Sequence, residues 1–66
     1  MFDKNNNRIR RGDFVRYDER IYRVSYIYFR TIILDDGEKK IALKVPRLTY
    51  PILNLEVVNH KTIIPN

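Results

Sequence analysis

The fold of this chain is set by residues 22–43, which read YRVSYIYFRTIILDDGEKKIAL. Two β-rich runs flank the pair Asp36-Gly37, and an Asp-Gly pair between apolar runs is the strongest short-range signal for a β-hairpin. Gly37 readily adopts the positive φ that a type I′ turn requires. We therefore expect an antiparallel hairpin with a two-residue Asp36-Gly37 loop.

The register of this hairpin follows from the length of its loop. With two loop residues, Leu34 lies opposite Lys39 and Ile32 lies opposite Ile41. Cross-strand partners point to the same face of a sheet, so one face is apolar and the other is mixed. The apolar face, which we expect in the core, carries Ile32, Leu34, Ile41 and Leu43. The other face, which we expect in solvent as part of the scaffold, carries Thr31, Ile33, Glu38, Lys40, Ala42 and Lys44.

Two stretches before the hairpin also predict strands. Residues 14–17 read FVRY, with Val15 and Tyr17 on one face and Arg16 pointing outward. Residues 21–34 form a longer β-rich run, and strands in small domains usually span about 5–6 residues. We therefore expect this run to be divided by a bend or bulge within residues 26–30, or else to form one strongly twisted strand. Because the run contains no glycine, a tight primed turn is not expected there.

The alternation of apolar residues in residues 21–34 predicts the direction of some side chains and leaves the direction of others undecided. Tyr22 and Val24 share the parity of the core, and Arg23 lies between them on the outer side. Tyr26 and Tyr28 fall where the alternation breaks, so the sequence does not decide their direction.

The two ends of the chain complete the predicted architecture. Residues 45–51 contain two prolines and predict a loop, residues 52–54 predict a short 3₁₀ turn, and residues 55–58 predict a last strand. Residues 1–7 are polar and predict a flexible leader. The domain itself is expected over residues 8–58, and residues 59–66 are expected to form a C-terminal tail.

This order of elements resembles the SH3-like barrels. Residues 12–17, GDFVRY, look like the first strand of KOW-type and ribosomal-protein members, and residues 48–58, LTYPILNLEVV, look like the turn and last strand of that architecture. The resemblance implies an all-β fold, a small antiparallel SH3-like barrel of about five strands with a short 3₁₀ turn before the last strand. An OB-like barrel is the competing topology.

Composition excludes several classes of site. The chain has 66 residues, which make one small domain, and it has no cysteine and one histidine. Disulfides and thiolate metal sites are therefore excluded, and we expect neither a metal nor a cofactor. No apolar run approaches the about 20 residues of a membrane helix, and the start of the chain lacks the apolar run of a secretory signal. We therefore expect a cytoplasmic protein without a membrane partner.

Catalytic chemistry is not expected either. Ser25 lies inside a predicted strand, and the acidic pairs Asp18-Glu19 and Asp35-Asp36 lie at predicted turns, where such residues are common. The sequence therefore predicts a binding protein rather than an enzyme.

Charge and aromatic residues point to the class of ligand. Lys and Arg outnumber Asp and Glu by 13 to 8, a net charge of +5 that attracts polyanions, although small domains also carry excess charge for solubility. Arginine pairs with phosphates, and aromatic rings stack on unpaired bases. We therefore expect contact with RNA or DNA. The candidate residues are Arg8, Arg10, Arg11, Arg16, Arg23, Arg30, Tyr26 and Tyr28.

A protein partner is the alternative. SH3-like barrels also bind extended peptides through aromatic grooves or pair a strand edge with a partner, and a small domain suits an accessory subunit or an inhibitor that docks on a larger assembly. The residues for this interpretation are Tyr50, Pro46 and Pro51. The sequence leaves the oligomeric state open.

Overall fold

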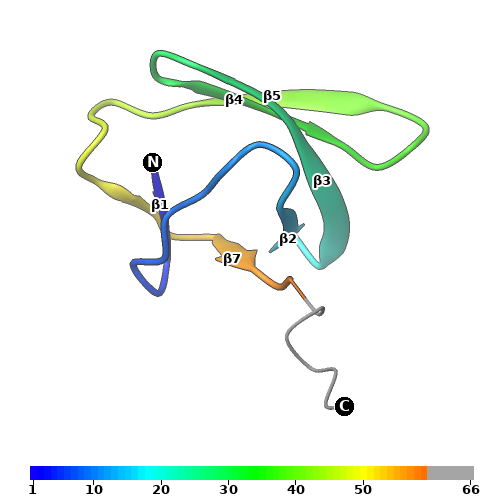
Figure 1. The fold of residues 1–66 in the computed structure, drawn as a ribbon, viewed down its shortest axis with the longest axis horizontal. Coiled ribbons are helices and arrows are strands. Elements are labelled where there is room, and N and C mark those ends of the chain that lie inside the picture. Colours follow the sequence, from blue (N-terminus) through cyan, green and yellow to red (C-terminus); the bar gives the residue numbers. More distant parts are fainter. Residues whose placement is uncertain (60–66) are drawn as a thin grey trace.

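The computed structural model describes residues 1–59, and every regular element in that range is a strand. The strands are β1 (Phe2–Asp3), β2 (Phe14–Tyr17), β3 (Arg20–Tyr28), β4 (Thr31–Asp35), β5 (Lys40–Lys44), β6 (Pro51–Ile52) and β7 (Leu55–Val57) (Figure 1). Within the same residues, none forms a helix long and apolar enough to cross a membrane. All of the expected tail except Asn59 lies outside the described residues.

The strands form one large antiparallel sheet and one small parallel sheet. The large sheet has the order β5-β4-β3-β2-β7, so that four consecutive strands form a meander and the last strand returns to pair with β2. In Figure 1 this sheet is strongly curved along β3, while β1 and β6 pair separately. The all-β antiparallel prediction is confirmed. The expected closed barrel is not found, because among residues 1–59 no strand pairing joins the edge strands β5 and β7.

The β4–β5 hairpin has the predicted faces but a different register. Leu34 pairs with Ile41 and Asp35 pairs with Lys40, so the loop has four residues rather than two. Gly37 has the expected positive φ of 98°, but Asp36 does not share it, and the type I′ prediction is therefore wrong. The register differs from the prediction by two residues, which leaves each side chain on the same face because side chains alternate with a period of two.

Side-chain hydrogen bonds of the loop aspartates explain why this loop is longer. Oδ1 of Asp36 accepts the backbone N–H groups of Glu38, at 2.8 Å, and Lys39, at 2.9 Å. Oδ1 of Asp35 accepts the N–H of Gly37 at 2.8 Å. Aspartate caps of this kind turn the chain without a tight primed turn.

The tight two-residue turns occur where the sequence has no glycine. Tyr17 pairs with Arg20, and both intervening residues, Asp18 and Glu19, have positive φ, 55° and 65°, as a type I′ turn requires. A second two-residue turn joins β3 to β4 and has Phe29 at a φ of 57°. The prediction that residues 26–30 hold no tight turn is therefore wrong. The long run is nevertheless divided within these residues, because the turn at Phe29 and Arg30 separates β3 from β4.

A β-bulge at Ser25 explains the broken alternation in β3. Val24 pairs with Leu34 while Tyr26 pairs with the next residue, Ile33, so Ser25 is one extra residue on the β3 side. Before the bulge, Tyr22 and Val24 face the core; after it, Ile27 does.

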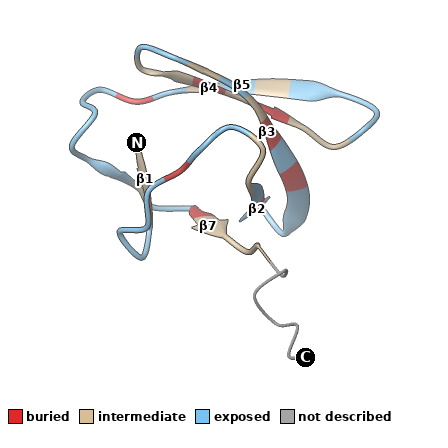
Figure 2. Cartoon of the chain, viewed as in Figure 1, coloured by how far each residue is buried: buried red, intermediate tan, exposed pale blue. Residues whose placement is uncertain are grey.

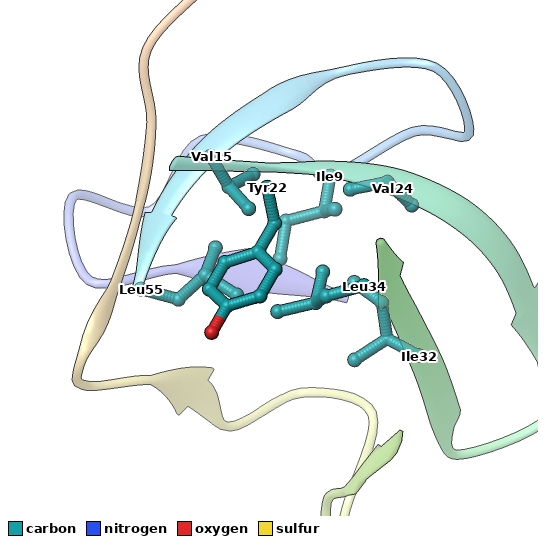
Figure 3. Packing of buried hydrophobic residues seen from close by; sticks show 7 residues of the cluster. All are labelled: Ile9, Val15, Tyr22, Val24, Ile32, Leu34 and Leu55. Carbon is teal, nitrogen blue, oxygen red and sulfur yellow. The ribbon is translucent and has the colours of Figure 1, made fainter. Parts of the chain in front are cut away.

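The core lies on the concave side of the sheet. Figure 3 shows the ring of Tyr22 within this cluster, and Figure 2 shows that the buried positions are spread over several strands and the β1–β2 segment. Tyr22 and Val24 are buried as predicted. The cluster consists of Ile9, Val15, Tyr22, Val24, Ile32, Leu34 and Leu55.

The first residues are part of the fold rather than a leader. Phe2 and Asp3 form β1, which pairs in parallel with Pro51 and Ile52 of β6. The expected 3₁₀ turn is absent from the described residues, where a two-residue turn at 53–54 joins β6 to β7. Within the residues expected to form a flexible leader, the side chain of Asp3 has a partner that is distant in sequence, the N–H of Val57.

The carboxylate of Asp3 is fully buried and fully hydrogen bonded. Its Oδ1 accepts the N–H groups of Asn5, at 2.9 Å, and Asn7, at 2.7 Å. Its Oδ2 accepts the N–H of Val57 in β7 at 2.7 Å and the side-chain amide of Asn7 at 3.4 Å. Burial by itself raises the pKa of Asp3. The four hydrogen bonds together lower this pKa by more than burial raises it, so the pKa lies below its usual value.

We expect Asp3→Asn to lower the free energy of unfolding by about 1–3 kcal/mol at neutral pH, because an NH₂ group then faces a backbone N–H that needs an acceptor. The folded-state pKa of Asp3 lies below its unfolded value, so the stabilisation is complete above about pH 4 and is lost as pH falls through the folded pKa. Urea unfolding should therefore show the deficit shrinking in acid. Exposed Asp18→Asn is the control, and a deficit that does not change with pH would contradict the role of Asp3.

We expect Glu19→Gly to stabilise the domain by about 0.5–1 kcal/mol, because glycine removes the cost of a left-handed backbone and recovers more than its own entropic penalty. The matched control is Glu38→Gly, at a loop position without positive φ. Urea denaturation midpoints of the two variants should move in opposite directions. Equal shifts would show that the Asp18-Glu19 turn is not strained.

Candidate nucleic-acid interface

The bulge at Ser25 places two tyrosines on the convex, solvent-facing side of the sheet. Tyr26 is 49% exposed and Tyr28 is 68% exposed. Their ring centroids lie 6.4 Å apart, and the ring planes differ by 14°. The sequence left their direction open, and the structure resolves it because the extra residue reverses the parity of β3.

Strand register places these rings among side chains of β4 and β5. Three rows cross the sheet on this side, and the middle row is mostly apolar while the flanking rows carry charge. We call the nine residues of these rows the outer platform. The rows are Tyr28, Thr31 and Lys44; Tyr26, Ile33 and Ala42; and Arg23, Asp35 and Lys40.

The cations of the outer platform are uncompensated by ion pairs. Arg23, Lys40 and Lys44 are exposed and form no salt bridge with any residue in the range 1–59. Asp35 lies between Arg23 and Lys40 in register, and one of its oxygens accepts the N–H of Gly37. The platform therefore carries a net positive charge.

Sequence reasoning missed the two lysines. It placed Lys40 and Lys44 on an exposed face of the hairpin, and both residues are exposed. Because the sequence left the direction of Tyr26 and Tyr28 undecided, it did not show that the lysines and the tyrosines share one surface. The available signal was the parity break at Ser25, which predicts that Tyr26 and Tyr28 join the same outer side if the bulge precedes them.

Three of the predicted arginines, Arg8, Arg10 and Arg11, lie in the segment between β1 and β2. Arg11 and Arg23 border a hollow of about 580 Å³ on the platform side. Arg11 also borders a second hollow of about 630 Å³, together with Arg8, Arg10 and Ile27. Arg11 therefore lines both hollows, the first with Arg23 of the platform and the second with Arg8 and Arg10.

Backbone hydrogen bonds hold this basic segment against β3. The N–H of Gly12 donates to the carbonyl of Val24, and the N–H of Val24 donates to the carbonyl of Asp13, both at 2.8 Å. Gly12 has a φ of 93°, which glycine adopts without strain. The turn is closed by Asp13, whose Oδ2 accepts the N–H of Arg10 at 2.8 Å.

Two predicted arginines are engaged elsewhere. Arg16 pairs with Glu56 across β2 and β7, with 3.0 Å between Nη1 and Oε1. Arg30 donates from Nη1 to the carbonyl of Pro46 at 2.9 Å, and its guanidinium lies 5.1 Å from the centre of the Phe29 ring. The structure therefore does not bring these two charges to the outer platform as free phosphate ligands.

The residues of the alternative protein-binding site lie on a different part of the molecule. Pro46 and Tyr50 belong to the loop between β5 and β6, and Pro51 begins β6. Tyr50 is 52% exposed, and the guanidinium of Arg47 lies 5.7 Å from the centre of its ring.

Several carboxylates of the described residues have structural roles, as Asp36 shows. Asp36 accepts two backbone N–H groups and forms an ion pair with Arg20, with 2.9 Å between Nη1 and Oδ2. Hydrogen bonds from the backbone of Lys39 and then Glu38 lower the pKa of Asp36, and Arg20 adds to this effect. Among residues 1–59, no group of three or more His, Cys, Asp or Glu side chains is placed to hold a metal ion. His60 lies outside the described residues.

Comparison with known proteins adds no relative from which a role might be transferred. No family model, no curated protein and no solved structure matches this chain. Function is therefore inferred from the fold, the exposed rings and the charges.

Acetylation with N-acetylimidazole should separate the tyrosines by their exposure. We expect Tyr26 and Tyr28 to react quickly and Tyr22, which is buried, to be protected until the protein unfolds. Trypsin places Tyr22 and the two platform tyrosines on different peptides, because Arg23 and Arg30 are cleavage sites. Peptide mass spectrometry thus reads the two environments separately, and equal rates in the folded protein would contradict the bulge.

Proposed function

We propose that this chain is a non-catalytic domain that binds RNA or DNA through the outer platform. The observation that carries the proposal is the pair of exposed, nearly parallel rings of Tyr26 and Tyr28, on the same face of the sheet as three cations that form no ion pair with any of residues 1–59. Lysine and arginine neutralise phosphates, and aromatic rings offer stacking surfaces to bases. The two kinds of group on one face match the two parts of a nucleotide.

The charges around the platform support the same ligand. The net charge of the chain is +5, and Arg11 borders the same hollow as Arg23 of the platform. Each phosphate that a cation neutralises releases counterions, so affinity falls as salt rises. We expect a domain of this kind to bind nucleic acid more tightly at low ionic strength than at high ionic strength.

The architecture is consistent with an SH3-like arrangement, which we propose for this sheet. The support is its strand order, in which a four-stranded meander is completed by a last strand that pairs with the first strand of the meander. In this proposal the sheet is an opened form of the barrel, with β5 and β7 unpaired to each other. The convex side of β3, β4 and β5 then remains available for a ligand.

A protein-interaction role is the second candidate. The observation that favours it is a run of exposed large apolar side chains close together in sequence, namely Leu48, Tyr50 and Leu53. Exposed aromatic and aliphatic side chains of this kind are typical of peptide-binding or docking surfaces. Nuclease treatment separates the candidates, because a complex held by nucleic acid is lost and a direct protein complex survives.

We expect the double variant Lys40→Ala/Lys44→Ala to weaken binding of a short oligonucleotide and to flatten its salt dependence. Each lost phosphate contact should reduce the slope of log K against log salt by about 0.7–1. Fluorescence anisotropy over a series of salt concentrations measures both effects. Lys4→Ala is the matched control, because Lys4 lies in a separate hollow with Asp18 and Glu19.

Two results would contradict the proposed function. One is that the unaltered protein binds neither single- nor double-stranded probes at low salt and high micromolar concentration. The other is that Lys4→Ala changes the salt slope as much as the platform variant does, which would place the contact surface elsewhere.

A further inference from the structure

We propose that the ligand of the Tyr26–Tyr28 ring pair is an unpaired nucleobase, so that the outer platform selects single-stranded over double-stranded nucleic acid. This inference rests on the proposed function and specifies its ligand. It concerns how the rings are used, whereas the proposed function concerns the surface as a whole.

The ring pair has open faces. Carbon atoms in van der Waals contact are about 3.5–4.0 Å apart, so two rings that covered each other's faces would have centroids near that distance. The centroids of Tyr26 and Tyr28 are 6.4 Å apart with planes only 14° from parallel, so the two rings are not in close face-to-face contact. Tyr26 is 49% exposed and Tyr28 is 68% exposed, so the rest of the protein leaves much of both side chains in solvent.

The rings are held in place before a ligand arrives. Both belong to the end of β3 that pairs with β4, whereas β2 pairs only with the first residues of β3, Arg20 to Arg23. Tyr26 pairs with Ile33 and Tyr28 pairs with Thr31, and these two partners are half-buried on the same face. A tyrosine side chain has few rotatable bonds, so its immobilisation on binding costs little entropy. The platform is thus preorganised for a flat ligand.

A base in a duplex does not offer its faces to such rings. Neighbouring base pairs cover them, and only the edges of the bases reach the grooves, where side-chain amides and charges read them. The middle row of the platform, Tyr26, Ile33 and Ala42, has one hydroxyl group and no side-chain amide or charge. This row therefore suits stacking and lacks the groups that read base edges.

The cations of the platform lie around the ring pair. Lys44 is in the row of Tyr28, two strands away, and Arg23 and Lys40 are in the row beyond Tyr26. Neighbouring strands are about 4.8 Å apart, which puts the backbone of Lys44 about 10 Å from that of Tyr28. A strand crossing the sheet can thus stack bases in the middle while its backbone meets the outer cations.

The test compares a short oligothymidylate with an abasic single strand of the same length and with the corresponding duplex, by fluorescence anisotropy at low salt. All three probes carry phosphates, but only the oligothymidylate offers unpaired bases. We expect the unaltered protein to bind the oligothymidylate about ten- to a hundredfold more tightly than the abasic strand, as base stacking on one ring implies. The unaltered protein should also bind the oligothymidylate more tightly than the duplex.

Variants at the ring assign this preference to Tyr28. Tyr28→Leu should reduce the preference for the oligothymidylate over the abasic strand, because only the ring of Tyr26 remains, while its salt slope is unchanged because the cations remain. Tyr28→Phe should keep the preference, since it keeps an aromatic face. Tyr50→Leu is the matched control, because Tyr50 is similarly exposed but lies off the platform. Urea unfolding checks that each variant is folded.

The outcomes separate this inference from the proposed function. If the unaltered protein binds the abasic strand or the duplex as tightly as the oligothymidylate, base stacking is overturned while nucleic-acid binding stands. If it binds none of the three probes, both fail. The comparison of probes on the unaltered protein does not depend on the folding of any variant, and loss of the preference in Tyr50→Leu would also overturn the inference.

Discussion

One extra residue in the central strand controls both the core and the exposed face of this domain. Ser25 interrupts the pairing of β3 with β4, so that Val24 and Ile27 both pack inward although they differ in parity. The same shift directs Tyr26 and Tyr28 outward. Without the bulge, the core would lose Ile27, and two large rings would have to enter a space that Tyr22 already fills (Figure 3).

A buried carboxylate supplies the long-range connection that a disulfide or metal often supplies in so small a domain. Asp3 joins the first strand and its turn to Val57 of the last strand, and all four of its hydrogen bonds come from groups that need an acceptor. Burial of a charge is costly unless it is compensated in this way. The net depression of its pKa shows that the hydrogen bonds outweigh the burial.

The turns show how local conformation is subordinate to strand pairing. Asp18 and Glu19 adopt left-handed backbone conformations that glycine adopts more easily, and Phe29 does the same at the next turn. These conformations persist because β2, β3 and β4 are aligned by their apolar faces. The loop that does contain an Asp-Gly pair is longer, because aspartate side chains cap its backbone.

The sequence by itself determined the strand class, the apolar faces of the hairpin and the inward direction of Tyr22, because alternation with a period of two survives even a change of register. It also determined the excess of positive charge. Only the tertiary structure decided the direction of Tyr26, the place of Asp3 and which arginines are already paired. These depend on a single bulge and on hydrogen bonds between residues 16 to 54 positions apart, the longest being the bond from Val57 to Asp3, and no local pattern encodes such partners.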